Sequence, residues 1–139
     1  MYVILVEDDR LQADETIGAI REAYPTAKIE HLSTESEFRK RLPEIEQSPP
    51  DVFVIDVMLR WANPSPDVPP PPLSVQEEGF YLAGFRCEDL LSKELPTLAV
   101  PVIMVTRLDE DDVRAALEGR PPNVTLMPKD LGPAALVEK

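Results

Sequence analysis

Short apolar runs alternate with segments of helical periodicity along this chain. Five runs rich in Val and Ile predict strands at residues 2–6, 27–31, 51–57, 100–105 and 124–127. Between them, apolar residues recur at the three- and four-residue spacing of one helix face. This spacing predicts helices around residues 13–24, 38–45, 80–91 and 113–117, and a last short helix that starts near Leu131.

Strict alternation of strands and helices is typical of an α/β fold, in which right-handed crossovers join parallel strands and helices cover both faces of the sheet. Segments 52–55 and 102–105 are apolar at every position, as expected for central strands. Thr34 and Glu37 form a capping-box pattern at the start of the second helix. Ligands of such sheets bind beyond the carboxyl ends of the strands, so functional residues are expected there.

Size and charge narrow the possible functions. With 139 residues the chain fits one domain, residues 1–139, and has no room for a second. Its 26 acidic residues against 14 Lys and Arg give a formal net charge of -12, which repels phosphate backbones and anionic membranes. We therefore expect protein partners, with no direct nucleic-acid binding and no membrane binding.

The cysteine count and the N-terminus indicate the cellular compartment. Cys87 is the only cysteine, so neither a disulfide framework nor a cysteine zinc cluster can form within the chain. The first apolar run meets charge at Glu7, too early for a signal peptide or a membrane span. We expect a cytoplasmic protein.

One segment departs from the alternation of strands and helices. Residues 60–73 (RWANPSPDVPPPPL) hold six prolines without a regular period, which favours an extended loop, and we place this insertion at about residues 60–76. It could be a docking strip for a proline-binding groove, a lid over the adjacent site, or a surface insertion without a role of its own. We favour the last interpretation.

Acidic, hydroxyl and amine side chains follow the predicted strands. Glu7 and Asp8 follow the first strand, Asp56 the third, Thr106 the fourth and Lys129 the fifth. Neighbouring carboxylates repel one another unless a cation offsets their charge, and hard oxygen ligands in a partly open site suit Mg²⁺. Such a site suits phosphoryl chemistry, in which a carboxylate attacks phosphorus while a cation, an ammonium and a hydroxyl stabilise the transferring oxygens.

Each residue type has a role in that chemistry. Asp56 is the expected nucleophile, with Thr106 as hydroxyl donor and Lys129 as cation. The expected Mg²⁺ ligands are Asp8 directly, Glu7 through water, Asp56, and the backbone carbonyl of Met58.

Simpler interpretations exist for the residues beside this site. Glu7, Asp8 and Asp9 could form an acidic turn that caps the first helix, and Asp9 is expected to face solvent. His31, at the end of the second strand, is expected to be structural or exposed.

Four segments together resemble the receiver domain of two-component response regulators: VILVEDD at 3–9, VFVID at 52–56, VIMVT at 102–106, and Lys129. The resemblance covers essentially the whole chain. It implies the CheY-like, flavodoxin-like sheet with strand order 2-1-3-4-5. It also implies a phosphoryl-accepting switch, in which a sensor histidine kinase or phosphotransfer protein phosphorylates Asp56 with Mg²⁺ and the phosphorylated domain changes its contacts with a downstream protein.

Departures from the receiver pattern leave alternatives open. Arg107 stands where a small residue is usual, Leu126 where many receivers have an aromatic, and Asp130 where proline usually follows the lysine. The chain could therefore be a receiver-like interaction module that works without phosphorylation, and its oligomeric state stays open. A Mg²⁺-dependent phosphohydrolase is disfavoured because Met58 stands where one such class places a second aspartate. We expect no enzyme beyond self-phosphorylation and dephosphorylation.

Overall fold

The computed structural model describes residues 1–57, 59, 83–94, 100–106 and 124–128. In chain order these residues form β1 (Tyr2–Val6), α1 (Arg10–Ala23), β2 (Lys28–Leu32), α2 (Glu35–Gln47), β3 (Val52–Asp56), α4 (Ala83–Glu94), β4 (Val102–Thr106) and β5 (Val124–Pro128).

All five strands pair in parallel in one sheet, in the order β2-β1-β3-β4-β5. This confirms the predicted α/β fold and its strand order. In the register of the sheet, Val6 pairs with Ile55 and Asp56 pairs with Val105. Residue 7 therefore follows β1 at the level where β3 ends, which brings two acidic positions to neighbouring strand ends.

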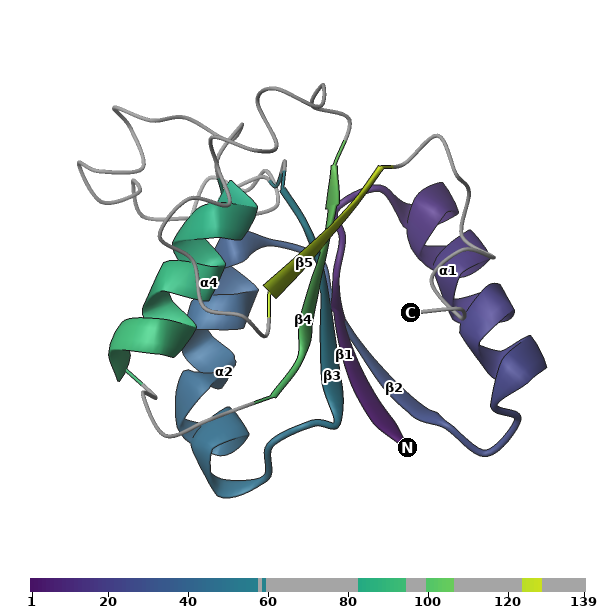
Figure 1. Cartoon of the computed structure of the whole chain (residues 1–139), viewed down its shortest axis with the longest axis horizontal. Helices are drawn as coiled ribbons and strands as arrows, with labels where there is room; N and C mark the ends of the chain where they lie inside the picture. The colour runs from purple at the N-terminus through teal and green to yellow at the C-terminus, as the bar shows by residue number, and fades with distance from the viewer. Residues whose placement is uncertain (58, 60–82, 95–99, 107–123, 129–139) are drawn as a thin grey trace, which may run out of the picture.

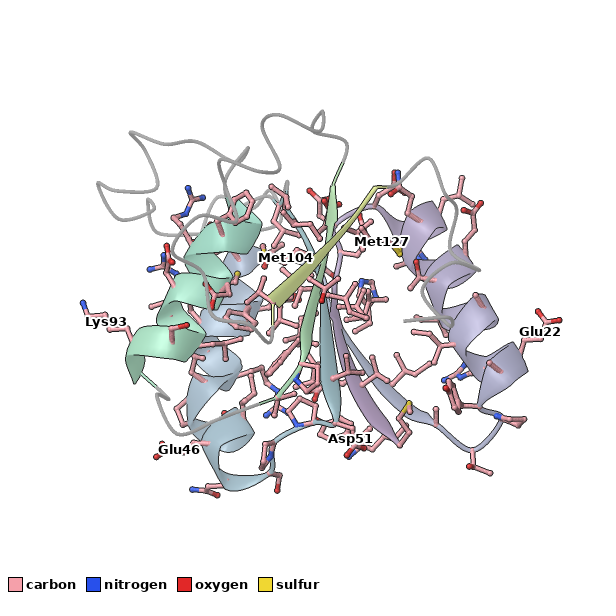
Figure 2. All side chains as sticks on the ribbon, in the orientation of Figure 1. Glu22, Glu46, Asp51, Lys93, Met104 and Met127 are labelled. Atoms are coloured by element: carbon pink, nitrogen blue, oxygen red, sulfur yellow. The ribbon has the colours of Figure 1, made fainter. Side chains whose placement is uncertain are left out.

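Helices cover both faces of the sheet: α1 lies on one face, and α2 and α4 lie on the other (Figure 1). Successive strand side chains point to opposite faces, so Val3 and Leu5 pack towards α1 while Ile4 and Val6 pack towards α2 and α4. Figure 2 shows the same division for two labelled side chains, with Met104 on the α4 side of the sheet and Met127 on the α1 side. Two apolar layers thus hold the strand ends in place.

Side-chain caps start both N-terminal helices. Asp9 caps α1, and its carboxylate accepts hydrogen bonds from the backbone N–H groups of the first turn. Thr34 caps α2, where its hydroxyl accepts from Glu37 N–H at 3.3 Å. In a capping box the glutamate three residues after the N-cap accepts from the N–H of the N-cap itself. Here the Glu37 carboxylate accepts instead from the N–H of Ser33, at 2.5 Å, one residue before the N-cap Thr34. The chain therefore leaves β1 and β2 along well-defined turns.

The predicted element bounds are close to the observed ones. The second strand lies one residue later than predicted, at Lys28–Leu32, and the fourth begins two residues later, at Val102. The helices predicted around 113–117 and from Leu131, and the proline-rich insertion, lie outside the described residues. Among the helices that the structure describes, none is both long and apolar enough to cross a membrane.

A buried ion pair joins α2 to α4. The Glu35 side chain is fully buried. Its carboxylate accepts from Arg86 Nη2 at 2.7 Å and from Arg86 Nε at 3.0 Å, while Arg39 Nη2 donates to it at 2.8 Å. Two guanidinium groups on one buried carboxylate offset much of the cost of removing its charge from water. The pair fixes how α4 sits against α2.

A more exposed cluster joins β1, β2 and α2. Arg41 donates two hydrogen bonds to the Glu30 carboxylate, at 2.8 and 2.7 Å, and Tyr2 donates its hydroxyl to the same group at 2.6 Å. These hydrogen bonds, led by those from Arg41, lower the pKa of Glu30. Both partners of the ion pair remain partly exposed, so water and salt weaken it.

Replacing Arg86 by leucine should lower the free energy of unfolding by about 3 kcal/mol, because it leaves the buried Glu35 carboxylate without its two-point partner. Arg41→Ala is the matched control. It removes an ion pair of the same type from a partly exposed position and should cost about 1 kcal/mol or less. Urea unfolding of both variants checks this, and equal losses would contradict the difference that burial predicts.

Candidate functional site

Three carboxylates meet at the carboxyl edge of the sheet. Glu7 follows β1 and Asp56 ends β3, and the two residues are 5% and 4% exposed. Asp8, the next residue along, is half-buried. One ligand oxygen of each residue lies within 4.8 Å of those of the other two. The structure thus brings together the three acidic side chains that sequence analysis selected, and we call Glu7, Asp8 and Asp56 the acidic cluster.

Hydrogen bonds from neighbouring residues hold Glu7. Its backbone N–H donates to the carbonyl of Leu32 at 3.0 Å, which extends the pairing of β1 with β2 by one residue. Its side-chain Oε1 accepts from the backbone N–H of Asp9 at 3.1 Å. On the other side, Nε2 of His31 lies 2.7 Å from the Glu7 carbonyl oxygen. His31 therefore contacts the acidic cluster, a contact that sequence analysis did not predict.

Asp9 is separate from the acidic cluster. It is exposed, as predicted, and its Oδ1 accepts from the N–H groups of Leu11 and Gln12 at 3.0 and 3.2 Å. The helix-capping interpretation of the acidic turn thus holds for Asp9, the N-cap of α1. Glu7 and Asp8 belong to the cluster with Asp56.

The first turn of α4 packs directly behind Asp56. Gly84 donates its N–H to the carbonyl of Val57 at 2.8 Å, and Val57 in turn donates to Val105 of β4 at 3.1 Å. A Cβ atom at position 84 would meet the carbonyl oxygen of Asp56 and would lie 2.6 Å from Cα of Val57. Only glycine allows this close approach of helix and strand. Sequence analysis placed this position in a helical pattern but did not detect the contact.

The remaining predicted site residues are only partly covered by the structure. Thr106 is the last residue of β4, the strand next to β3, which ends at Asp56. The Thr106 side chain, Met58, Lys129 and Arg107 lie outside the described residues, so their predicted roles stay predictions. Leu126 in β5 is partly buried and packs against the core that faces α2 and α4.

The donor chemistry of the acidic cluster fits a hard divalent cation. Its three side chains offer only carboxylate oxygens, which Mg²⁺ and Ca²⁺ prefer, whereas zinc sites usually include nitrogen or sulfur ligands. Two nearly buried carboxylates side by side repel each other, and a cation between them would offset that repulsion. The exposed part of Asp8 leaves the cluster open to solvent on one side.

Comparisons with solved structures find the same fold in receiver domains. The signal receiver domain of a DNA-binding response regulator from Colwellia psychrerythraea 34H superposes with a TM-score of 0.68 at 21% identity, over 99% of this chain and 93% of that one. A CheY-like receiver domain protein from Methanospirillum hungatei JF-1 gives 0.65 at 19% identity, over 99% and 87%. A LuxR-family DNA-binding response regulator from Staphylococcus aureus gives 0.67 at 15% identity, over 99% and 92%.

No protein-family model and no curated protein matches the chain in sequence. At these identities the structural likeness establishes the fold: this chain has the CheY-like receiver fold, as its sequence motifs predicted.

Substitution of Gly84 by alanine should destabilise the protein by about 1 to 3 kcal/mol, because the added methyl group must displace the backbone of Asp56 and Val57. Gly18→Ala is the matched control, since Gly18 is exposed on α1 and has nothing near its added Cβ atom. It should stabilise the protein by about 0.5 to 1 kcal/mol. Thermal and urea unfolding measure both effects, and a stabilising Gly84→Ala variant would contradict the close approach.

Proposed function

We propose that this chain is a phosphoryl-accepting signalling receiver. Asp56 takes a phosphoryl group from a sensor histidine kinase or a phosphotransfer protein in a Mg²⁺-dependent reaction, and the modified domain changes its contacts with a downstream protein. The observation that carries the proposal is the acidic cluster, three carboxylates within 4.8 Å at neighbouring strand ends of a receiver fold.

The acidic cluster supplies the ligands for the cation. Asp8 would bind the cation directly and Glu7 through water, and Asp56 and the backbone carbonyl of Met58 would complete the protein ligands. Bound Mg²⁺ supplies positive charge that offsets the developing charge on phosphoryl oxygens. The restraints on Glu7 from Leu32 and Asp9 favour binding, because the ligands then need little reordering.

Asp56 is the nucleophile. One of its carboxylate oxygens attacks the phosphorus of a phosphohistidine, so that an O–P bond forms as the P–N bond breaks. The departing imidazole nitrogen keeps the electron pair and takes a proton from solvent. Asp56 is only 4% exposed, which keeps bulk water away from the acyl phosphate that forms on it. The hydroxyl of Thr106 and the ammonium of Lys129 donate hydrogen bonds to the phosphoryl oxygens.

The proposed partners are proteins. A net charge of -12 opposes direct nucleic-acid and membrane binding, and we place the protein in the cytoplasm, where sensor kinases present their phosphohistidine. The chain catalyses only its own phosphorylation and dephosphorylation and is not an enzyme for a separate substrate.

One observation favours a second function, that of a receiver-like interaction module without phosphorylation. Leu126 fills a partly buried position in β5 against the core, at the site where many receivers have a reporting aromatic. A leucine there removes that way of transmitting the state of Asp56.

Incubation with acetyl phosphate and Mg²⁺ separates the two functions. Wild type should gain the mass of one phosphoryl group, and Asp56→Asn should gain none. Asp9→Asn is the matched control, because it removes a neighbouring charge outside the acidic cluster while asparagine still caps α1. It should gain one phosphoryl group as wild type does. Intact-mass spectrometry reads each outcome, and chelation of Mg²⁺ should abolish the gain.

Other results would point elsewhere. A wild type that takes no phosphoryl group at any Mg²⁺ concentration supports the interaction module. Continuous phosphate release over many turnovers indicates a phosphohydrolase.

A further inference from the structure

His31 is the only histidine of the chain, and it lies beside the acidic cluster. It is the fourth residue of β2, where its backbone pairs with Leu5 of β1. Its half-buried side chain extends past Val6 to the end of β1, where Nε2 lies 2.7 Å from the carbonyl oxygen of Glu7. The imidazole thus contacts the backbone of Glu7, the segment that carries the Glu7 and Asp8 carboxylates.

The chemistry of this contact determines the tautomer of the imidazole. A carbonyl oxygen only accepts hydrogen bonds, so a contact of 2.7 Å requires a hydrogen on Nε2, and His31 is the donor. The Glu7 carbonyl is part of the peptide plane that also contains the N–H of Asp8. A donor that fixes this oxygen therefore fixes the direction in which the chain leaves Glu7 towards Asp8.

The bond from His31 acts together with two others on the same residue. Leu32 accepts from the Glu7 N–H at 3.0 Å, and Asp9 donates its N–H to Glu7 Oε1 at 3.1 Å. Glu7 is thereby held at its backbone nitrogen, its backbone oxygen and its side chain. β2 supplies two of these three contacts, immediately before it turns into α2 at the cap residue Thr34.

We propose that His31 is a positioning residue for the acidic cluster: its Nε2–H holds the Glu7–Asp8 peptide so that both carboxylates face Asp56. Three carboxylates within 4.8 Å repel one another, and a turn without this bond would relax to separate them. The effect on Mg²⁺ binding rests on the proposed function, whereas the effect on the turn exists without any cation.

Variants that differ only in the donor test the proposal. His31→Leu keeps an apolar side chain but loses the N–H, and His31→Gln keeps a side-chain N–H that can reach the same carbonyl. The measurements are the backbone amide resonances of Asp8 and Asp9 without cation, and the Mg²⁺ affinity from titration of those resonances. Loss of one hydrogen bond should weaken Mg²⁺ binding roughly three- to tenfold in His31→Leu, and His31→Gln should restore most of it.

Tyr2→Phe controls for a purely structural effect. It removes the hydrogen bond from the Tyr2 hydroxyl to Glu30, also between β1 and β2 but made by the first residue of β1. It should lower the melting temperature without changing Mg²⁺ affinity. If His31→Leu loses no more Mg²⁺ affinity than Tyr2→Phe does at a similar loss of melting temperature, or if Gln fails to restore the affinity, the positioning role is wrong.

One measurement decides the proposal independently of Mg²⁺ binding, and a second decides it independently of the leucine variant's folding. If wild type binds no Mg²⁺, the proposed function fails, and the cation-free amide resonances still decide the positioning role: a shift in His31→Leu that Gln reverses supports it, and unchanged resonances overturn it. In wild type, the imidazole nitrogens of this single histidine should show hydrogen on Nε2. An Nε2 without a hydrogen would overturn the proposal.

Discussion

The acidic cluster depends on the register between β1 and β3. Because Val6 pairs with Ile55, the two strands end at the same level, and Glu7 and Asp56 lie next to each other although 49 positions separate them in the sequence. This arrangement opposes electrostatics, since nearly buried carboxylates repel each other. The apolar layers on both faces of the sheet supply the free energy that maintains the register in spite of this repulsion.

The buried ion pair between α2 and α4 supports the end of β3 that carries Asp56. The Glu35 carboxylate, with Arg86 and Arg39, fixes α4 against α2, and the first turn of α4 touches the backbone of Asp56 through Gly84. One continuous set of contacts therefore runs from the interior of the helix layer to the proposed acceptor. A displacement of α4 cannot leave the backbone at Asp56 unchanged, because no space separates the two.

Much of the fold could be predicted from local pattern. Central parallel strands are covered on both sides and read as unbroken apolar runs, and the acidic residues are conspicuous because they follow these runs directly. The contacts of His31, Arg86 and Gly84 could not be predicted in this way. The position of a histidine or an arginine in the sequence does not reveal which carbonyl or carboxylate its side chain will contact. A glycine within a helical pattern predicts only a loss of helix propensity. These contacts depend on how elements distant in sequence pack, and periodicity carries no information about that packing.

The hydrogen bond from Gly84 N–H to the Val57 carbonyl also bears on the proline-rich part of the sequence, which lies between these two residues. Val57 and Gly84 are in direct contact although 27 positions separate them in the sequence, so the chain between them begins and ends at one point of the sheet edge. For a chain closed in this way, the entropic cost rises only with the logarithm of its length, about 0.6 kcal/mol for each doubling. With both ends fixed at the same point, a change in the length of the chain between Val57 and Gly84 need not alter the spacing of the carboxylates.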